Sequence, residues 1–299
     1  MNTTLNAALL AQLSDLELRA KIIAQGALHG QHASRQRGSG VEFSQFRAYE
    51  PGDAMSLLDW KLFARSDRYY VREAMRESNL NIWAVLDGSA SMLEHSSGSN
   101  LTKLQYAQWL ISAIFYVGHR QGDAVGLLCA GQNGAFIPAQ TTRQHYYRCL
   151  MQLDSVTAQG VFPDTTALQH QFSKLQRNAL TVVVSDFYQQ GTEIDKMLTR
   201  LKSTHTDVLS IQLETRDEAE FNFHGLVKMT ERETGRQRKF DADAVRPGYL
   251  AKRRDFNRSL AQRCATRGIT HLCVNIDEPI EQNIRAVLQA TADSAESVR

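Results

Sequence analysis

Two short apolar runs that each end in an aspartate constrain the fold of this chain most. Residues 80–86 (LNIWAVL) lead directly into Asp87, and residues 180–184 (LTVVV) lead through Ser185 into Asp186. Apolar runs of this length are typical of strands buried on both faces, which occur in parallel sheets covered by helices. Ligands bind at the carboxyl ends of such strands, so Asp87 and Asp186 are candidate site residues.

The pattern around these two runs alternates between strands and helices. Strands are expected at 124–130, 135–138, 207–213 and 270–276, and helices at 101–120, 142–153, 166–177, 192–202, 247–267 and 280–292. This alternation predicts an α/β fold with a doubly wound, mainly parallel sheet. The order breaks within residues 214–243, where 226–232 and 237–241 indicate a β-hairpin with Gly235 supplying the turn.

The length of 299 residues suits one large α/β domain or about two smaller ones. Leucines and isoleucines at helical spacing predict a helix within the first 36 residues, and the stretch after it has no regular period. We therefore expect a helical and irregular N-terminal segment, residues 1–78, that packs on a main domain at 79–292. The hairpin is an insertion near 214–243, and residues 293–299 are expected to be a frayed polar tail.

Composition and motif content exclude several classes of protein. The net charge of +2 gives no global attraction to nucleic acid. No apolar run approaches the ~20 residues of a membrane helix, and the N-terminus lacks the basic region of a signal peptide, so a cytoplasmic location is expected. The sequence has no P-loop, no GxGxxG turn after a strand and no HExxH motif, which argues against nucleotide hydrolysis, dinucleotide binding and catalytic zinc.

The residues around Asp87 predict a metal site. Asp87, Ser89 and Ser91 alternate along a loop that leaves a strand, so their side chains can turn to the same side. Carboxylate and hydroxyl oxygens are hard ligands of the kind that Mg²⁺ favours, together with waters. Thr166 would add a hydroxyl, and Asp186 a second carboxylate, directly or through water. Taken alone, Asp87, Ser89 and Ser91 are more typical of a helix N-cap cluster than of a metal site.

The same residues resemble a known family. Asp87-Gly88-Ser89-Ala90-Ser91, Thr166-Ala167-Leu168 and Ser185-Asp186 resemble the metal-ion-dependent adhesion site of von Willebrand factor A domains. Upstream, residues 38–43 (GSGVEF), 47–53 (RAYEPGD), 58–60 (LDW) and 71–73 (VRE) resemble the hallmark of the bacterial Domain of Unknown Function 58 family. The family often has Gly before the metal Thr, where this chain has Thr165, so Thr165 is an alternative to Thr166 as the ligand.

The resemblance implies a von Willebrand factor A or Rossmann-like fold and a binding function without catalysis. It implies Mg²⁺, with Mn²⁺ or Ca²⁺ as alternatives, and one coordination position left for an acidic side chain of a protein partner. The implied ligands are Asp87, Ser89, Ser91, Thr166 and Asp186. Family members are typically encoded beside MoxR-type AAA+ ATPases. The expected role is therefore an adaptor for such an ATPase in chaperone-like protein maturation or complex assembly, with no nucleic acid and no membrane insertion.

Three alternatives stay open. A magnesium-dependent phosphoryl hydrolase would also place an Asp at the end of the first strand, but an aspartyl-phosphate enzyme needs a second Asp where this chain has Ser89. The helix at 247–267 carries six Lys and Arg against one Asp, which is typical of a solvated face; an acidic partner is the next reading and nucleic acid the last. The upstream block is either an ion-pair network that docks the N-terminal segment or a partner-contact surface; its residues are Arg47, Asp53, Asp59, Trp60 and Arg65.

Overall fold

The computed structural model describes residues 16–32, 45–48, 70–73, 80–95, 98, 101–131, 134–164, 166, 168–172, 174, 179–188, 192–203, 206–230, 232 and 235–298. Contacts divide the chain into two compact units, Gln31–Ser78 and the remainder, Met1–Gly30 with Asn79–Arg299. The described part of the smaller unit is an antiparallel pair of strands, β1 (Gln45–Ala48) and β2 (Tyr70–Glu73).

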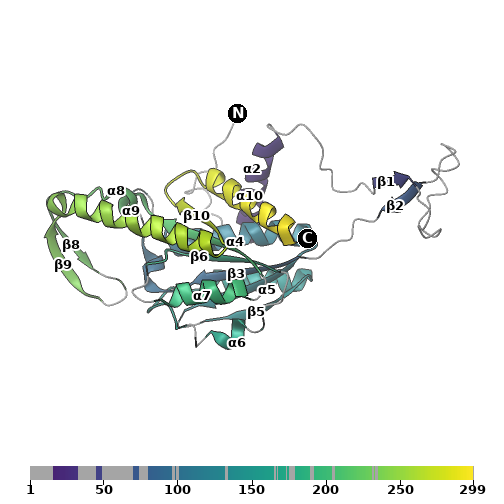
Figure 1. Cartoon of the computed structure of the whole chain (residues 1–299), viewed down its shortest axis with the longest axis horizontal. Coiled ribbons are helices and arrows are strands. Elements are labelled where there is room, and N and C mark those ends of the chain that lie inside the picture. Colours follow the sequence, from purple (N-terminus) through teal and green to yellow (C-terminus); the bar gives the residue numbers. More distant parts are fainter. Residues whose placement is uncertain are drawn as a thin grey trace. The chain divides into compact units, whose positions relative to one another are not determined.

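Six strands form the central sheet of the larger unit (Figure 1). Their spatial order is β10 (Thr270–Asn275), β7 (Asp207–Glu214), β6 (Ala179–Ser185), β3 (Asn81–Asp87), β4 (Ala124–Ala130) and β5 (Phe136–Gln140). All neighbours pair in parallel except β5, which is antiparallel to β4. From β3 the chain builds outward through β4 and β5, then returns to build β6, β7 and β10 on the other side. The predicted doubly wound α/β sheet is confirmed, and its topological switch point lies between β3 and β6.

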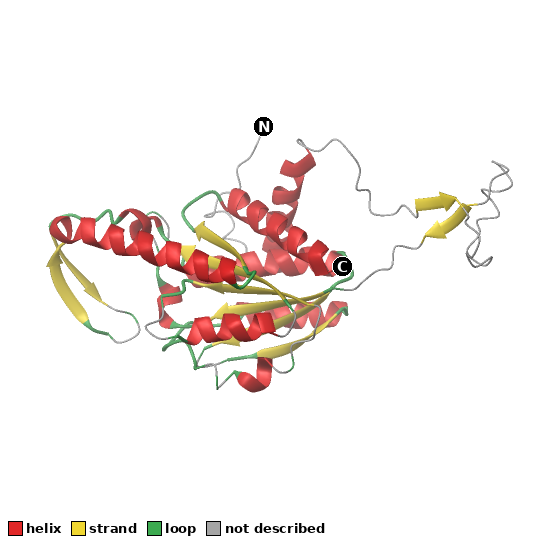
Figure 2. Cartoon of the chain, in the orientation of Figure 1, coloured by secondary structure: helices red, strands yellow, loops and turns green. Residues whose placement is uncertain are grey.

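Helices cover both faces of this sheet (Figure 2). One core holds α2 (Leu16–His32), α4 (Lys103–Arg120), α5 (Arg143–Asp154) and α10 (Ile280–Val298), and the other holds α6 (Gln169–Phe172), α7 (Glu193–Ser203) and α9 (Ala242–Thr266). Strand β3 serves both, with Ile82, Ala84 and Leu86 in the first core and Trp83 and Val85 in the second. Side chains alternate between the faces of a strand, which is why the apolar run is continuous.

The helix α2 belongs to the main core. Leu16, Ile23, Ala24 and Ala27 are buried in the same cluster as residues of α4 and α10. The helix expected near the N-terminus therefore forms, and it completes the larger unit. No helix in the described part of the chain is long and apolar enough to cross a membrane.

One predicted helix is much shorter than expected. Among the described residues, α6 spans Gln169–Phe172, whereas the pattern predicted 166–177. Asp164 Oδ1 accepts a hydrogen bond from the Thr166 amide at 3.0 Å. The Thr166 amide is thus bonded within a turn that precedes the helix.

Two other helices are longer than predicted. Helix α9 begins at Ala242 because the Asp241 side chain accepts from the Asp243 amide and caps it, which leaves Pro247 inside the helix. Helix α10 continues to Val298, through the tail that was expected to fray. Ala295 and Glu296 favour helix in that segment, and a polar composition alone does not end a helix.

The hairpin forms as predicted from the sequence. Strands β8 (Leu226–Thr230) and β9 (Gln237–Asp241) pair antiparallel. Gly235 has a φ of 70°, a left-handed conformation that glycine adopts without a steric penalty. The hairpin forms a sheet of its own, apart from the six central strands.

The close contact between β3 and β4 leads to a stability prediction. A Cβ added at Gly126 would lie 2.8 Å from ring carbons of Trp83 and 2.9 Å from the backbone nitrogen of Ala139. Trp83 is fully buried and stacks on Phe136, so neither neighbour can move away freely. Gly126→Ala is expected to lower the free energy of unfolding by about 1–3 kcal/mol, measured by urea denaturation.

A matched glycine in α9 provides the control for this substitution. Gly248 has no atom within 4 Å of an added Cβ, and Ala favours the helix interior by about 1 kcal/mol over Gly. Gly248→Ala is therefore expected to leave the protein as stable as before or more so. Equal effects of the two substitutions would contradict the tight packing of β4 against Trp83.

Candidate functional site

The two aspartates at the strand ends lie together at the switch point of the sheet. Strands β3 and β6 are parallel neighbours, so Asp87 at the end of β3 and Asp186 directly after β6 lie at the same edge. Each residue is only 1% exposed. Ligands of doubly wound sheets bind in the crevice at this position.

The carboxylate of Asp87 is held by its own loop and by β6. Its Oδ1 accepts from the Ser89 amide at 2.8 Å, and its Oδ2 accepts from the Ser185 hydroxyl at 2.5 Å. Burial, and then the nearby charge of Asp186, raise the pKa of Asp87 from 3.8 to about 6. A cation bound beside these two buried carboxylates would offset the repulsion that Asp87 receives from Asp186.

The hydroxyls of Ser89 and Ser91 lie next to the Asp87 loop. Their Oγ atoms are 3.0 Å apart, and Ser89 is fully buried. Ser89 precedes the short 3₁₀ helix η2 (Ala90–Leu93), yet its side chain makes no capping hydrogen bond. The Ser89 hydroxyl is thus not used as an N-cap, and it bonds instead to the hydroxyl of Ser91 in the first turn of η2.

Backbone bonds hold this loop in place. The Gly88 amide donates to the Ala130 carbonyl at 2.7 Å, and the Ala90 amide donates to the Gly160 carbonyl at 2.9 Å. The Gln159 amide returns a bond to the Gly88 carbonyl. The loop after β3 is therefore clamped between β4 and the segment that leads toward Thr166.

The backbone directly after Asp186 is strained. Phe187 has a φ of 62°, a left-handed conformation that a bulky side chain rarely adopts. The Phe187 amide donates to the Ser185 hydroxyl at 2.9 Å, and the Tyr188 amide donates to Asp186 Oδ1 at 3.1 Å. These bonds stabilise a conformation that costs on the order of 1–3 kcal/mol and that occurs most often at functional sites.

A buried lysine, which sequence reasoning missed, contacts the second aspartate. Lys103 is the first residue of α4, is fully buried, and places its Nζ 3.4 Å from Asp186 Oδ2 and 2.6 Å from Glu218 Oε1. A cation at a helix N-terminus is disfavoured by the helix dipole. The two carboxylates compensate for this and stabilise the ammonium group of Lys103 at that position. Burial lowers the pKa of Lys103, but Asp186 and Glu218 outweigh burial and the pKa lies above its ordinary value.

Glu218 connects this lysine to the insertion after β7. It lies in α8 (Arg216–Glu220), where its Oε2 accepts from the Thr215 amide in a capping box. The Glu218 carbonyl accepts from the Tyr249 hydroxyl of α9 at 3.1 Å. The only hint in the sequence was a lone Lys at the start of an apolar helix, and Glu218 follows it by 115 residues.

The remaining predicted site residues are not all brought to this place. Thr166 is exposed, and its amide donates to Asp164. Thr165 lies outside the described residues, so the choice between the two threonines stays a prediction. In the upstream block, the backbone of Arg47 is in β1, and the other residues lie outside the described part of the chain: Asp53, Asp59, Trp60 and Arg65.

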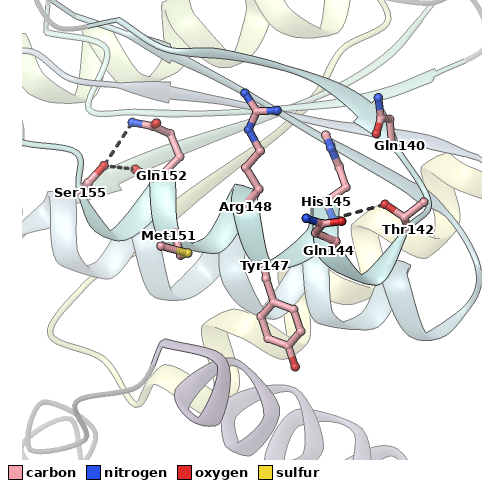
Figure 3. A pocket seen from close by; sticks show the side chains of 9 residues that line it. All are labelled: Gln140, Thr142, Gln144, His145, Tyr147, Arg148, Met151, Gln152 and Ser155. Carbon is pink, nitrogen blue, oxygen red and sulfur yellow. Dashed lines mark hydrogen bonds between the residues drawn. The ribbon is translucent and has the colours of Figure 1, made fainter.

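A separate pocket lies along α5, away from these acids (Figure 3). It has a volume of about 810 Å³ and is lined by side chains of α5 together with Gln140. The His145 ring is already bonded to the Val125 carbonyl at 3.1 Å, and the Tyr147 hydroxyl donates to Glu17 at 2.9 Å. His145 and Tyr147 thus bond α5 to its neighbours.

Within the described residues, no group of three or more His, Cys, Asp and Glu side chains converges on one point. A cation at this edge would therefore depend on hydroxyl oxygens as well as carboxylates. Two carboxylates and the hydroxyls of Ser89 and Ser91 form a hard-oxygen set of the kind that Mg²⁺ takes, completed by water.

Comparison with known proteins gives a family and uncharacterized relatives. The model of the family described as "Protein of unknown function DUF58" matches residues 45–259. The "Uncharacterized protein Mb1516" of Mycobacterium bovis and the "Uncharacterized protein Rv1480" of Mycobacterium tuberculosis are each 30% identical over 259 residues, covering 85% of this chain and 78% of theirs. These relatives assign no activity.

Solved structures with a similar arrangement are distant in sequence. An aerotolerance-related membrane protein from Bacteroides fragilis is 16% identical, with a TM-score of 0.47 over 73% of this chain and 99% of that one. The SpRpn10 VWA domain is 11% identical, with a TM-score of 0.38 over 69% of this chain and 93% of that one.

Proposed function

The chain belongs to the DUF58 family of proteins of unknown function, and from that premise we propose that it is a non-enzymatic, metal-dependent adaptor that binds a protein partner. The contact is proposed at the edge of the sheet that carries Asp87 and Asp186. The observation that carries the proposal is the pair of buried carboxylates at the switch point, beside two hydroxyls that cap no helix.

The charges around the site support a divalent cation. The single buried ammonium group of Lys103 contacts two carboxylates, those of Asp186 and Glu218, and Asp87 lies near enough to Asp186 for the two charges to repel. Lys103 contacts Asp186 and Glu218, whereas Asp87 receives neutral donors from Ser89 and Ser185. Asp87, Ser89 and Ser91 are therefore the proposed direct ligands, and Asp186 acts directly or through water. Thr165 or Thr166 completes the proposed set.

The set suits binding better than catalysis. A bound divalent ion supplies an electrophilic centre that an acidic side chain of a partner can complete. A phosphoryl-transfer enzyme of the Asp-x-Asp kind needs an acid or base two residues after the nucleophile. This chain has the Ser89 hydroxyl there, 3.0 Å from another hydroxyl. The resemblance to families encoded beside MoxR-type AAA+ ATPases makes such an ATPase the proposed partner.

Direct metal binding is the first test of the proposal. Mn²⁺ titration of the purified chain, followed by electron paramagnetic resonance, is expected to show one bound ion that Mg²⁺ displaces. Asp87→Ala is expected to weaken this binding by about 100-fold or more, because it removes the central ligand. Asp255→Ala, which removes an exposed carboxylate on α9, serves as the control and is expected to bind normally.

Partner capture is the second test. The tagged chain is expected to retain a MoxR-type AAA+ ATPase from the native lysate in millimolar Mg²⁺, and to lose it in EDTA or with Asp87→Ala. If the ATPase were retained in EDTA, the contact between the two proteins would not depend on the metal. Turnover of p-nitrophenyl phosphate that disappears in Asp87→Asn would overturn the non-enzymatic assignment in favour of a hydrolase.

A further inference from the structure

One face of the β8–β9 hairpin, called its outer face below, carries two lysines in an unfavourable position. Lys228 and Lys239 are directly opposite each other in the pairing register, so their side chains share one face, and both are exposed. Like charges at directly opposite positions destabilise a hairpin. Within the described part of the chain, neither lysine has an acidic side chain as a partner.

The inner face of the hairpin differs from this outer face. Val227 and Met229 alternate with exposed residues of β8 and are half-buried, and so is Phe240 of β9. The Phe240 ring stacks on the buried Phe221 ring with centroids 6.4 Å apart. Packing therefore accounts for the inner face and leaves the lysine face open to solvent.

The hairpin also has free backbone edges. Strands β8 and β9 pair only with each other in the described part of the chain, and Figure 1 shows the ribbon extending away from the central sheet. An isolated two-stranded hairpin is marginally stable, and its outer edges expose unpaired N–H and C=O groups. A third strand would satisfy one of these edges.

An ion pair links the hairpin turn to the segment that follows the candidate metal loop. Arg232 Nε donates to Glu94 Oε2 at 2.6 Å, and Glu94 directly follows η2. A partner whose acidic side chain reached a metal bound at Asp87 would therefore also lie close to this hairpin. The lysine face itself does not depend on a bound metal.

We propose that the β8–β9 hairpin binds an extended acidic segment of a protein partner by strand addition. The segment pairs with one outer edge of the hairpin, so that an Asp or Glu side chain lies beside the lysine of the adjoining strand, on the face that it shares with the second lysine. The charge complementarity identifies the occupant as acidic, and the free edges favour a peptide, since a nucleic acid has no amide ladder to offer them. The partner's identity rests on the proposed function above, whereas this surface is tested without metal.

The test uses a fluorescein-labelled peptide of alternating Glu and Val, with fluorescence anisotropy of the full chain measured in EDTA. Lys228→Glu/Lys239→Glu is expected to weaken binding at least about tenfold, and higher salt is expected to weaken binding by the unaltered chain. The control Lys252→Glu/Arg254→Glu makes the same change of net charge on exposed positions of α9 and is expected to bind as before. Circular dichroism checks that both variants are folded.

Strand addition has its own readout. A peptide N-methylated at every second residue loses the amides of one edge, so one of the two methylation registers is expected to abolish binding and the other to preserve it. Equal binding of both methylated peptides would overturn strand addition. If the α9 control variant lost as much affinity for the peptide as the hairpin variant, the two lysines would not be the binding surface. Equally tight binding of a peptide of alternating Lys and Val would contradict it as well.

Two further outcomes separate this proposal from the metal-dependent one. Peptide binding that requires Mg²⁺ and ignores Lys228→Glu/Lys239→Glu would reject the hairpin surface and leave the proposed function standing. Tight binding of single-stranded oligothymidine that is lost in the same variant would show a nucleic-acid surface and overturn the peptide assignment. If the peptide bound in EDTA and the separate titration showed no bound Mn²⁺, the hairpin proposal would be supported and the metal-dependent function would be rejected.

Discussion

Replacement of Lys103 by Met is expected to lower the free energy of unfolding by about 3–5 kcal/mol. The substitution keeps an unbranched side chain of similar size but removes the ammonium group between Asp186 and Glu218. Asp186 is 1% exposed, so water cannot take the place of the lost charge. A buried carboxylate left without its partner carries the full penalty of desolvation.

The measurement is urea denaturation at neutral pH in EDTA. Lys202→Met is the matched control, because Lys202 lies 3.2 Å from Asp207 in a pair whose side chains are 33% and 28% exposed. That variant is expected to lose no more than about 1 kcal/mol. Adding Asp186→Asn to Lys103→Met is expected to recover part of the loss. Equal losses for the Lys103 and Lys202 variants would contradict the role of burial.

Replacement of Asp87 by Asn is expected to stabilise the protein in EDTA at neutral pH and to abolish its stabilisation by Mg²⁺. Burial and the charge of Asp186 raise the pKa of Asp87 from 3.8 to about 6 in the folded state. The folded protein thus holds this proton more tightly than the unfolded chain does. The stability from protonation is complete below about pH 4 and is lost as the pH rises through about 6.

The size of this effect follows from the same two values. The difference between 3.8 and about 6 corresponds to about 3 kcal/mol at pH 7, as an upper estimate of what the amide can recover. The Asn amide oxygen can still accept from the Ser89 amide, so the loop keeps that bond. In Mg²⁺ the order reverses, because only the carboxylate binds the ion.

Thermal unfolding at pH 5 and pH 7, in EDTA and in Mg²⁺, measures both parts of this prediction. Asp123→Asn is the control: Asp123 is 3% exposed and accepts from the Leu80 amide at 3.0 Å, before the start of β4 and therefore at the opposite edge of the sheet. That variant is expected to keep the response to Mg²⁺. If Mg²⁺ stabilised Asp87→Asn as much as the unaltered chain, Asp87 would not be a ligand.

Local patterns were sufficient to predict the sheet and the two aspartates. Each apolar run is a strand buried on both faces, and a mainly parallel sheet follows from the alternation of strands and helices, whereas the pairing of β3 with β6 is a result of the structure. The hairpin and its turn at Gly235 were predicted for the same reason, since turn chemistry is local. Helix ends were less predictable: α6 starts at Gln169, later than the pattern predicted, and the cap at Asp241 starts α9 early.

The charges around Asp186 could not be predicted, because they come from segments far apart in the chain. Lys103 was assigned only to a helix, and Glu218 only to the region of the insertion, yet they meet at 2.6 Å. A lysine buried in an apolar helix looks the same in sequence as a lysine that extends to solvent. The acids that hold it become neighbours only when β6, α4 and α8 pack together.

By itself, the sequence determined the class of the fold, the two strand ends that carry Asp87 and Asp186, and the adjacent serines, because period, turns and strand ends are properties of neighbouring residues. Tertiary structure alone decided that α2 completes the main core, that Ser185 bonds Asp87, and that Lys103 neutralises Asp186. It also placed Lys228 and Lys239 directly opposite each other, with no acidic partner among the residues that the structure describes. Burial and charge pairing depend on distances in space, which spacing along the chain does not specify.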